Sequence, residues 1–324
     1  MTELVTIDIG GTHARFALAE IADDGGIALG EPVTLHTADH GSFELAWQAF
    51  AAHLGRTLPA AAALSIAGPV GGAVIRFTNN PWTIRPGALE REIGATRVTL
   101  VNDFAAVAYA VAIAPASEFV HLCGPDVPLP ATGTISVIGP GTGLGVGHLW
   151  RDGAGGYHVQ ATEGGHVAFA PLDTIDDAIL ARLRRRYPRV SAERVVSGPA
   201  IVELYGALAA LEGRAVEPHD DKTLWQLGTS GRDSLAAAAV ERFCLSLGAV
   251  AGDIALAQGA SGVVVAGGLG LRLKDTLLRS GFAQRFVAKG RFEGLMAALP
   301  VRLITHPQPG LFGAAAAFAK EHLA

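Results

Sequence analysis

The sequence contains little cysteine and little lysine. Its 324 residues include two cysteines, Cys123 and Cys244, which lack the spacing of a metal site. We expect both to be packing residues in a reduced compartment, and we therefore expect a cytoplasmic protein. The formal net charge of −5 and the pI of about 6.1 leave no basic footprint, so nucleic acid is not an expected partner.

Long apolar runs and targeting signals are also missing. The uncharged apolar stretch from Phe104 to Pro115 is too short to span a bilayer, and the first residues enter a strand without signal-peptide character. We therefore expect no membrane partner. Glycine is abundant, with 41 residues, and apolar side chains make up 50% of the chain. This composition favours close-packed α/β layers over disorder, and the length allows two domains.

Predicted strands and helices alternate along the chain, which indicates α/β layers around a parallel or mixed sheet. The proline-rich stretch 115–132 is typical of a connector. We expect a small domain of residues 1–114 plus 307–324 and a large domain of residues 115–306, with a ligand cleft between them. The last helix, 310–322, is expected to pack on the first domain. The expected strands cover 3–9, 15–20, 32–37, 61–66, 73–77, 97–101, a hairpin at 134–150, a strand from 261 into a glycine pair, and 301–305; the expected helices cover 42–55, 86–94, 103–114, 173–187, 198–212, 222–228, 231–258, 269–290 and 310–322.

Two glycine-threonine turns lie about one domain apart, and each joins two apolar runs. The first is Asp8-Ile9-Gly10-Gly11-Thr12, and the second is Gly139-Pro140-Gly141-Thr142-Gly143. Glycine lets backbone N–H groups converge on an anion, and threonine adds a hydroxyl donor. Either turn alone fits an ordinary β-hairpin at least as well. Two such turns facing each other would hold a polyphosphate from both sides, and the pair therefore favours a phosphoryl-transfer enzyme.

The chain lacks a lysine-based phosphate site. It has no P-loop and no G-x-G-x-x-G motif opening a helix after the first strand, and none of its four lysines lies near either turn. Backbone amides, threonines and Mg²⁺ must then neutralise most of the phosphate charge. Asp8, at the end of the first strand, is the candidate to face this ion, directly or through water.

The pair Asn102-Asp103 ends a predicted strand, which is where α/β sheets bind ligands. Asp103 fits a helix N-cap as well as a base that takes a proton from a hydroxyl, and one residue can do both. The asparagine amide can hold a neighbouring hydroxyl.

Other polar residues are more ambiguous. Glu163-Gly164-Gly165-His166 lacks the further ligands of a zinc site and fits a pair of hydroxyl-binding groups better. The local sequence of Glu193 favours a solvated residue paired with an arginine. The turn Asn79-Asn80-Pro81-Trp82 fits a packed aromatic slightly better than a pocket lining. Taken together, the carboxylates and amides suit a polyhydroxylated neutral ligand; they are Asn102, Asp103, Glu163, His166 and Glu193.

Six motifs in order give the chain a resemblance to a known family. They are Asp8-Ile-Gly-Gly-Thr12, Leu100-Val-Asn-Asp-Phe104, Gly139-Pro-Gly-Thr-Gly-Leu-Gly145, Glu163-Gly-Gly-His-Val-Ala-Phe-Ala-Pro171, Val190-Ser-Ala-Glu-Arg-Val-Val-Ser-Gly-Pro199 and Val265-Ala-Gly-Gly268. From residue 3 to about residue 315 the chain resembles the bacterial ATP-dependent glucokinases of the actin-like sugar kinase superfamily. The resemblance implies a two-lobed, actin-like (ribonuclease H-like) α/β fold. The zinc-binding cysteine cluster of the related repressor and sugar-kinase group is missing, which favours the glucokinase branch.

The resemblance also implies roles for individual residues. Asp103 would be the base that takes the proton from the 6-hydroxyl of glucose, and the family is commonly dimeric, which implies a homodimer. The other sugar hydroxyls would be bound by Asn102, Glu163, His166 and Glu193, with Asn79 as a further candidate. ATP would be bound through its phosphates by Gly10, Gly11, Thr12, Gly141, Thr142 and Gly143, through Mg²⁺ placed by Asp8, and at adenosine by Gly267 and Gly268.

Three residues depart from the family pattern. His13 stands in place of an asparagine, Pro140 in place of a small residue, and Ala168 in place of an aspartate. The first two touch the donor side. Rival functions are a kinase for fructose, mannose or an N-acetyl hexosamine, a sugar-responsive regulator, which would need a DNA-binding domain before residue 3, and an actin-like ATPase without a sugar substrate.

Overall fold

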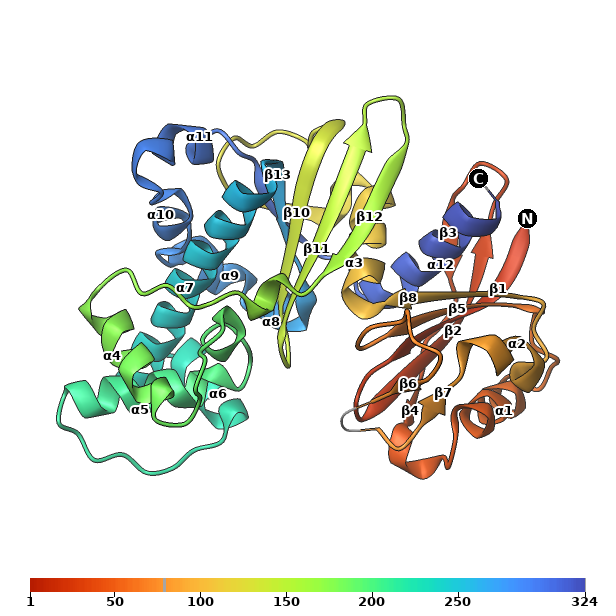
Figure 1. Ribbon diagram of the computed structural model, residues 1–324, viewed down its shortest axis with the longest axis horizontal. Helices are drawn as coiled ribbons and strands as arrows, with labels where there is room; N and C mark the ends of the chain where they lie inside the picture. Colours follow the sequence, from red (N-terminus) through yellow and green to blue (C-terminus); the bar gives the residue numbers. More distant parts are fainter. Residues whose placement is uncertain (78–79, 324) are drawn as a thin grey trace. The chain divides into compact units, whose positions relative to one another are not determined.

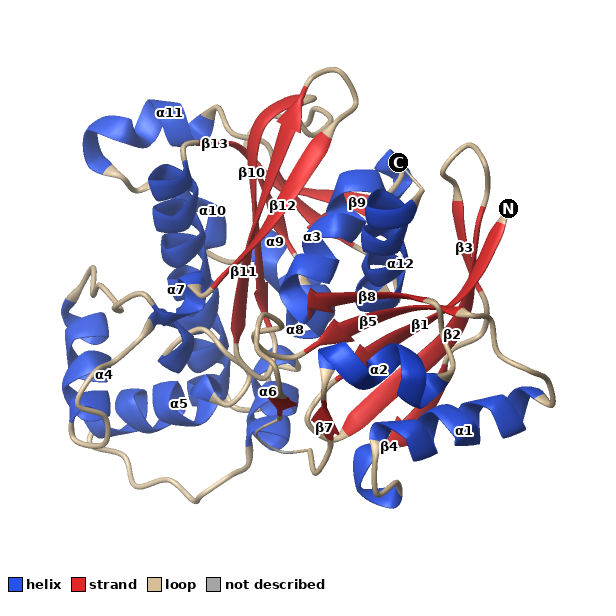
Figure 2. Cartoon of the chain, turned by 45° about the vertical axis from the view of Figure 1, so that its right-hand side comes forward, coloured by secondary structure: helices blue, strands red, loops and turns tan. Residues whose placement is uncertain are grey.

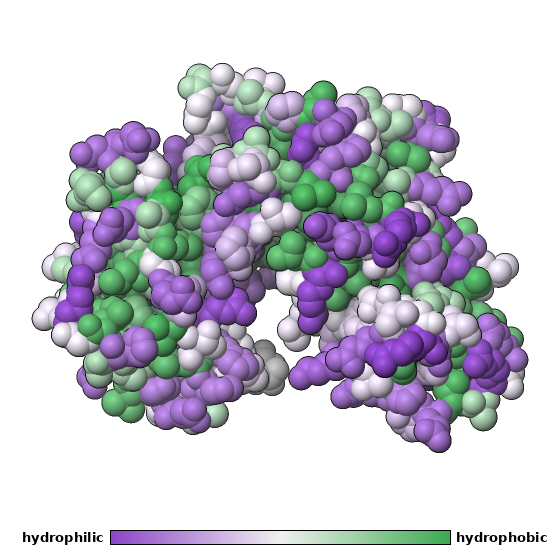
Figure 3. Space-filling model, turned by 180° about the vertical axis from the view of Figure 1, so that it is seen from behind, coloured by the Kyte–Doolittle hydropathy of each residue, from purple (hydrophilic) through white to green (hydrophobic). Residues whose placement is uncertain are grey.

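The computed structural model describes residues 1–77 and 80–323. The chain forms two compact units (Figure 1). Unit 1 consists of Met1–Ala114, Val159–Ala161 and His306–Ala324, and unit 2 of Pro115–His158 and Thr162–Thr305. On the face seen in Figure 3, hydrophilic residues are interspersed with hydrophobic ones over the surface.

Unit 1 is built on a mixed sheet with the strand order β3-β2-β1-β5-β8, and β4 also pairs with β2. Strand β1 is parallel to β5, and β5 is parallel to β8, whereas β1 and β2 form an antiparallel hairpin. Every residue of β5 is buried, as expected for a central strand with both faces covered. The strands are β1 (Thr2–Ile9), β2 (His13–Ile21), β3 (Ile27–Leu29), β4 (Val33–His36), β5 (Ala61–Ile66) and β8 (Arg97–Asn102), with a separate pair β6 (Ile75–Arg76) and β7 (Thr83–Ile84).

Helices cover both faces of this sheet, as Figure 2 shows. Helices α1 (Phe43–Leu54) and α2 (Pro86–Ile93) pack with one face in an aromatic-rich cluster. Helices α3 (Asp103–Ile113) and α12 (Pro309–His322) pack with the other face, mainly through alanines. The last helix therefore packs on the first part of the chain, as predicted.

Small side chains let α3 and α12 approach closely. A Cβ atom added at Gly313 of α12 would lie 1.7 Å from the carbonyl oxygen of Ala106 in α3. Real Cβ atoms never come this close to a backbone oxygen, so only glycine fits at this crossing. The alanine and glycine content of the C-terminal segment is thus a packing requirement.

Unit 2 repeats the same plan. Its sheet has the order β12-β11-β10-β13-β14-β9; β10 and β11 form an antiparallel hairpin, and β10, β13 and β14 are parallel. The two glycine-threonine turns thus occupy equivalent places, each joining the two strands of a hairpin. The strands are β9 (Phe119–Cys123), β10 (Thr132–Pro140), β11 (Leu144–Asp152), β12 (Tyr157–Thr162), β13 (Ala260–Val265) and β14 (Val301–Ile304).

The helices of unit 2 and one face of its sheet share a single hydrophobic cluster. The long helix α7 (Ser234–Gln258) is the one described helix with the length and hydropathy of a membrane span, but 78% of its most apolar window is buried inside the protein. Protein side chains cover it, as in a core helix. The other helices are α4 (Thr174–Arg184), α5 (Ala200–Leu211), α6 (Asp221–Thr229), α8 (Gly267–Arg272), α9 (Lys274–Arg279), α10 (Phe282–Val287) and α11 (Glu293–Ala297).

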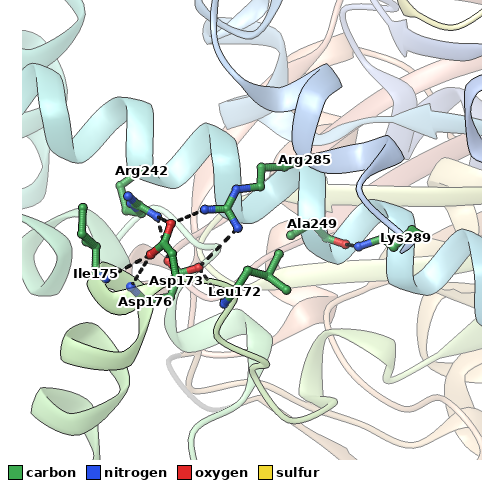
Figure 4. A network of polar contacts seen from close by, with 8 residues as sticks. All are labelled: Leu172, Asp173, Ile175, Asp176, Arg242, Ala249, Arg285 and Lys289. Carbon is green, nitrogen blue, oxygen red and sulfur yellow. Dashed lines mark hydrogen bonds and ion pairs between the residues drawn. The ribbon is translucent and has the colours of Figure 1, made fainter. Parts of the chain in front are cut away.

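Partly buried ion pairs connect the start of α4 to α7 and α10 (Figure 4). Arg242 Nη1 lies 2.8 Å from Asp173 Oδ2 and 3.1 Å from Asp176 Oδ1, and Arg285 also binds Asp173. Asp173 Oδ1 caps α4 by accepting from the backbone N–H groups of Ile175 and Asp176. Burial opposes ionisation of Asp173, but these arginines and the cap outweigh it and lower its pKa to about 2.

Several predicted elements differ from the structure. The segment 115–132, predicted to be a connector, contains the edge strand β9. This strand was missed because its short apolar run lies in a stretch with four prolines. The polar strand β12 was missed, since it carries no clear alternation of apolar residues. The strand expected at 73–77 shrinks to β6, and the helices expected over 269–290 are the three short helices α8, α9 and α10.

Both cysteines are free thiols, and their placement agrees with a packing role. Cys244 is buried in α7, and Cys123 is partly buried at the end of β9. Burial raises the pKa of each thiol to about 12. Neither is therefore an activated nucleophile.

Candidate active site

In the first glycine turn, in unit 1, the carbonyl oxygens accept hydrogen bonds from neighbouring segments of the chain. Gly10 O accepts from Asn80 Nδ2, Gly11 O accepts from Thr37 Oγ1, and Thr12 O accepts from the Thr37 N–H group. Within residues 1–77 and 80–323, the N–H groups of Gly11 and Thr12 have no hydrogen-bond acceptor. A turn with fixed carbonyls and open amides is suited to bind an anion.

Asp8 ends β1 just before this turn. Its Oδ1 accepts from Ser65 Oγ at 3.1 Å, and its Oδ2 lies 3.5 Å from Arg15 Nη1. Burial raises the pKa of Asp8, although Arg15 and Ser65 act in the opposite direction. Gly310, near the start of α12, lies so close that an added Cβ would be 3.0 Å from Asp8 Cγ.

The Asp8 carboxyl group is suited to bind Mg²⁺. A quarter of the side chain is exposed, and Mg²⁺ is held by one or two carboxylates together with phosphate oxygens and water. The described part of the chain has no cluster of three His, Cys, Asp or Glu side chains that could hold a metal alone. A dedicated all-protein metal cage is therefore absent from the described residues.

Asn102 and Asp103 lie at the same edge of the sheet as Asp8, because β1, β5 and β8 are parallel. Asn102 is the N-cap of α3: its Oδ1 accepts from the N–H groups of Phe104 and Ala105 at 3.0 Å each. The N-cap role considered for Asp103 was wrong, since Asp103 is the first helical residue. Two strand spacings of about 4.8 Å each separate Asp8 from the end of β8.

The second glycine turn joins β10 and β11 in unit 2. It is closed by a hydrogen bond from Gly141 N to Gly143 O at 2.8 Å. Gly198 N donates to Gly141 O at 2.7 Å, and Glu193 Oε2 accepts from Leu144 N at 3.0 Å. The solvated, arginine-paired state considered for Glu193 was therefore wrong, because its carboxylate binds the backbone of this turn.

The segment Glu163–His166 lies on β11 and reaches the same region. Added Cβ atoms at Gly164 and Gly165 would lie 2.8 Å from Val146 Cγ1 and 2.0 Å from Leu144 O, so both glycines are required for this contact. Glu163 and His166 remain exposed, with 3.8 Å between Glu163 Oε2 and His166 Nε2.

A short backbone pairing then connects this segment to that of Glu193. Phe169 N donates to Val190 O at 3.0 Å, Ala192 N donates to Val167 O at 2.8 Å, and Ala168 bridges to Ser191. Within unit 2, the structure thus brings together the second glycine turn, the Glu163–His166 segment and Glu193.

Gly267 and Gly268 begin α8 beside the second turn. Gly267 has φ +82°, and a Cβ there would lie 2.7 Å from Pro140 O, so glycine is required both for its backbone conformation and for its contact. Ala266 N donates to Ile138 O at 2.8 Å, which fixes this glycine pair to β10.

The predicted site residues fall into two groups. Unit 1 holds Asp8, Gly10, Gly11, Thr12, Asn102 and Asp103; unit 2 holds Gly141, Thr142, Gly143, Glu163, His166, Glu193, Gly267 and Gly268. Asn79 lies outside the described residues, whereas its neighbour Trp82 is a buried aromatic, as the sequence favoured.

Sequence reasoning missed Ser65 and Gly198, which bind Asp8 and the second turn, and Gly310, which lies against Asp8. It named Asn80, which binds the first turn, only as one of two asparagines that could line a pocket. Ser65 is a lone hydroxyl in the apolar strand β5, and this was the available signal. A depression of about 200 Å³ in unit 1 involves none of the predicted residues; it is lined by Thr99, Leu100, Val101, Tyr109, Ala317, Lys320 and Glu321.

Comparisons with known proteins cover almost the whole chain. The family model for glucokinases matches residues 5–321. A glucokinase of Zymomonas mobilis is 56% identical over 320 residues, covering 99% of this chain and 98% of the relative. A glucokinase of Caulobacter vibrioides is 41% identical, covering 97% of this chain and 94% of the relative. A glucokinase structure from an Antarctic psychrotroph gives a TM-score of 0.86 at 33% identity, with 99% of both chains covered.

Proposed function

This chain belongs to the glucokinase family, and from that membership we propose that it transfers the γ-phosphoryl group of ATP to the 6-hydroxyl of D-glucose. The products are glucose 6-phosphate and ADP. The fold is that of the actin-like sugar kinases, as the resemblance implied. The observation that carries the proposal is the 56% identity over nearly the full chain, combined with an acid at the end of β8 that is not used as the helix cap.

We assign Asp103 as the base. As the 6-oxygen forms its bond to the γ-phosphorus, the bond from that phosphorus to the β–γ bridging oxygen breaks, and the hydroxyl proton passes to the Asp103 carboxylate. Asn102 holds the sugar beside it: one amide hydrogen donates to Gly68 O at 3.2 Å, which leaves the second hydrogen for a sugar hydroxyl. Catalysis of this loose transition state depends on alignment and charge neutralisation.

The remaining sugar hydroxyls need directional partners and little charge. We assign this task to Glu163, His166 and Glu193, with Asn79 as a further candidate. Glu163 and His166 are exposed and flank Gly164 and Gly165, two positions where only glycine fits. Glu193 is partly exposed. The polar atoms of all three side chains can therefore contact a ligand.

The donor side is assigned to the two glycine turns. In the first turn Gly10 N donates to His13 O, while Gly11 and Thr12 offer open amides and Thr12 a hydroxyl to phosphate oxygens. Gly141, Thr142 and Gly143 form the second turn. Gly267 and Gly268 allow the adenosine to approach the backbone. Asp8 would hold Mg²⁺ directly or through water, and this ion would neutralise charge on the β- and γ-phosphates.

We further propose a cytoplasmic homodimer whose product enters glycolysis. Support comes from the family resemblance, the free thiols with raised pKa values and the absence of a basic excess in the sequence. Neither nucleic acid nor a membrane has a part in this proposal.

The test is a coupled assay of the pure protein with ATP, Mg²⁺ and a panel of glucose, fructose, mannose and N-acetyl hexosamines. We expect glucose to give the highest kcat/KM and ATP turnover to require it. A higher kcat/KM for another hexose would reassign the substrate. ATP hydrolysis at the same rate without sugar would reject the kinase assignment.

A further inference from the structure

We propose that Glu193 is a positioning residue for the nucleotide as well as a ligand of the sugar, and that it couples the two binding events. One carboxylate oxygen holds the second glycine turn in shape, and the other is left for the sugar. The proposal rests on the proposed function for the identity of the two ligands. The contacts that carry it lie entirely within unit 2.

The Glu193 carboxylate lies directly on the turn. Its Oε2 accepts from Leu144 N at 3.0 Å, and a Cβ added at Gly143 would lie 2.4 Å from the same oxygen. Any side chain at position 143 would therefore push the carboxylate away. Glycine is thus needed at position 143 for the contact with Glu193, in addition to the space it would leave for a phosphate group.

The Glu193 segment is rigid enough to hold the turn. Buried Ala192 donates its N–H to Val167 O at 2.8 Å, which fixes the backbone just before Glu193. At the other end, Gly198 N donates to Gly141 O at 2.7 Å. The segment therefore binds the turn at both sides, once through a side chain and once through the backbone.

The second oxygen gives the coupling. A carboxylate offers about four acceptor positions. Among the described residues, Glu193 Oε1 has no hydrogen-bond donor, and the side chain is partly exposed. A sugar hydroxyl bound there would restrict the carboxylate and, through Oε2, the turn. Because coupling between two ligands is reciprocal, a nucleotide on the turn would restrict the carboxylate for the sugar.

The first test measures Mg·ADP binding by calorimetry in the absence of sugar. Glu193→Ala removes the acceptor for Leu144 N, and we expect the Kd for ADP to rise about tenfold, since hydrogen bonds to charged groups are the stronger ones. Glu193→Gln keeps an oxygen acceptor of the same shape, and we expect ADP affinity within about twofold of the original. Glu217→Gln is the matched control: it makes the same change at an exposed carboxylate of unit 2 that lies outside the candidate site.

The second test uses Gly143→Ala, which alters no proposed sugar ligand. We expect the Kd for glucose to rise about tenfold, because the new methyl group displaces the carboxylate. In the double variant Gly143→Ala/Glu193→Ala, glucose affinity should fall no further than in Glu193→Ala alone, which is the non-additivity of residues in contact. Thermal unfolding of each variant establishes that it is folded.

Two results would overturn the inference: ADP affinity in Glu193→Ala equal to that of the unmodified protein, or additive losses of glucose affinity in the double variant. Failure of the proposed function would look different. The unmodified protein would then fail to phosphorylate glucose, whatever the variants do to ADP binding.

Discussion

Asn102 Nδ2 donates a hydrogen bond to the carbonyl oxygen of Gly68 at 3.2 Å and so joins the end of β8 to the loop that follows β5. The same side chain caps α3 through its Oδ1. The structural work at this strand end is thus done by Asn102. The carboxylate next to it, on Asp103, is not the N-cap of α3, and we propose that it takes the proton in the reaction.

Asp103→Asn should separate catalysis from folding. Asparagine keeps an oxygen that can accept from Phe104 N, as Asp103 Oδ1 does at 2.8 Å, and Asn102 still caps the helix. We expect unchanged unfolding in urea, glucose binding close to the original, and a kcat lower by about a hundredfold or more, the usual contribution of a general base. Near-original kcat would remove Asp103 from the base role.

Asn102→Ala, unlike Asp103→Asn, should lower the stability of the fold. It removes the N-cap acceptor and the contact to Gly68. We expect the free energy of unfolding to fall by about 1–2 kcal/mol, as for other lost N-caps. Urea unfolding of this variant beside Asp103→Asn provides the comparison, and equal stability of the two variants would contradict the assigned division of roles.

Gly313→Ala should destabilise unit 1. The added methyl group would overlap Ala106 O, since the Cβ position lies 1.7 Å from it, and α12 must move away from α3. We expect a loss of about 3 kcal/mol in urea unfolding, typical of severe overpacking. Gly87→Ala in α2 is the matched control: its Cβ would meet no atom within 4 Å, so we expect it to be neutral or slightly stabilising. Equal effects of the two substitutions would contradict the close helix crossing.

The Asp173 network predicts a definite pH dependence of stability. The folded-state pKa of about 2 lies below the ordinary value, so the stabilisation is fully present above about pH 4 and is lost as the pH falls towards 2. Asp173→Asn keeps a cap oxygen but removes the charge that faces Arg242 and Arg285.

We therefore expect Asp173→Asn to lose about 2 kcal/mol at pH 7, and the difference from the unmodified protein to shrink as the pH falls from 4 to 2. Urea unfolding of both proteins at pH 7, 4, 3 and 2.5 measures it. A difference that stays constant over this range would show that the charge of Asp173 is not the stabilising feature.

His13, one of the three departures from the family pattern, follows the first glycine turn and has a defined contact there. Its Nδ1 lies 2.9 Å from Thr12 Oγ1, and its ring is 4.4 Å from that of His36. His13→Ala removes the contact that orients the Thr12 hydroxyl towards the phosphates in our proposal, and we expect the KM for ATP to rise about threefold, the effect of one neutral hydrogen bond. The KM for glucose should not change. A changed KM for glucose with an unchanged KM for ATP would contradict a role of His13 in binding ATP.

Most of the regular elements were predictable from the sequence, because long helices and apolar strands carry clear periodicity. The hairpin with its glycine turn was found in both units, since glycine and threonine between two apolar runs are a local signal. Strand β12 was not predictable in this way: its position is fixed by pairing with β11, a contact that leaves no apolar pattern in β12 itself.

The candidate site was predictable only as far as local motifs reach. Asp8, Asn102 and Asp103 are found from their places at strand ends, but the hydrogen bond from Ser65 to Asp8 depends on register between strands distant in sequence. The contact of Glu193 with Leu144 is likewise non-local, and local reasoning assigned that residue wrongly. The facing of the two glycine turns across a cleft stays a prediction.

The central claim is phosphoryl transfer from ATP to the 6-hydroxyl of glucose. Phosphorus–proton correlation NMR of the reaction of the pure protein with ATP, Mg²⁺ and glucose tests it most directly. The account predicts one new phosphate ester whose phosphorus couples to the two protons on carbon 6, formed in equal amount with ADP. Coupling to the anomeric proton, or inorganic phosphate released without any sugar ester, would contradict it.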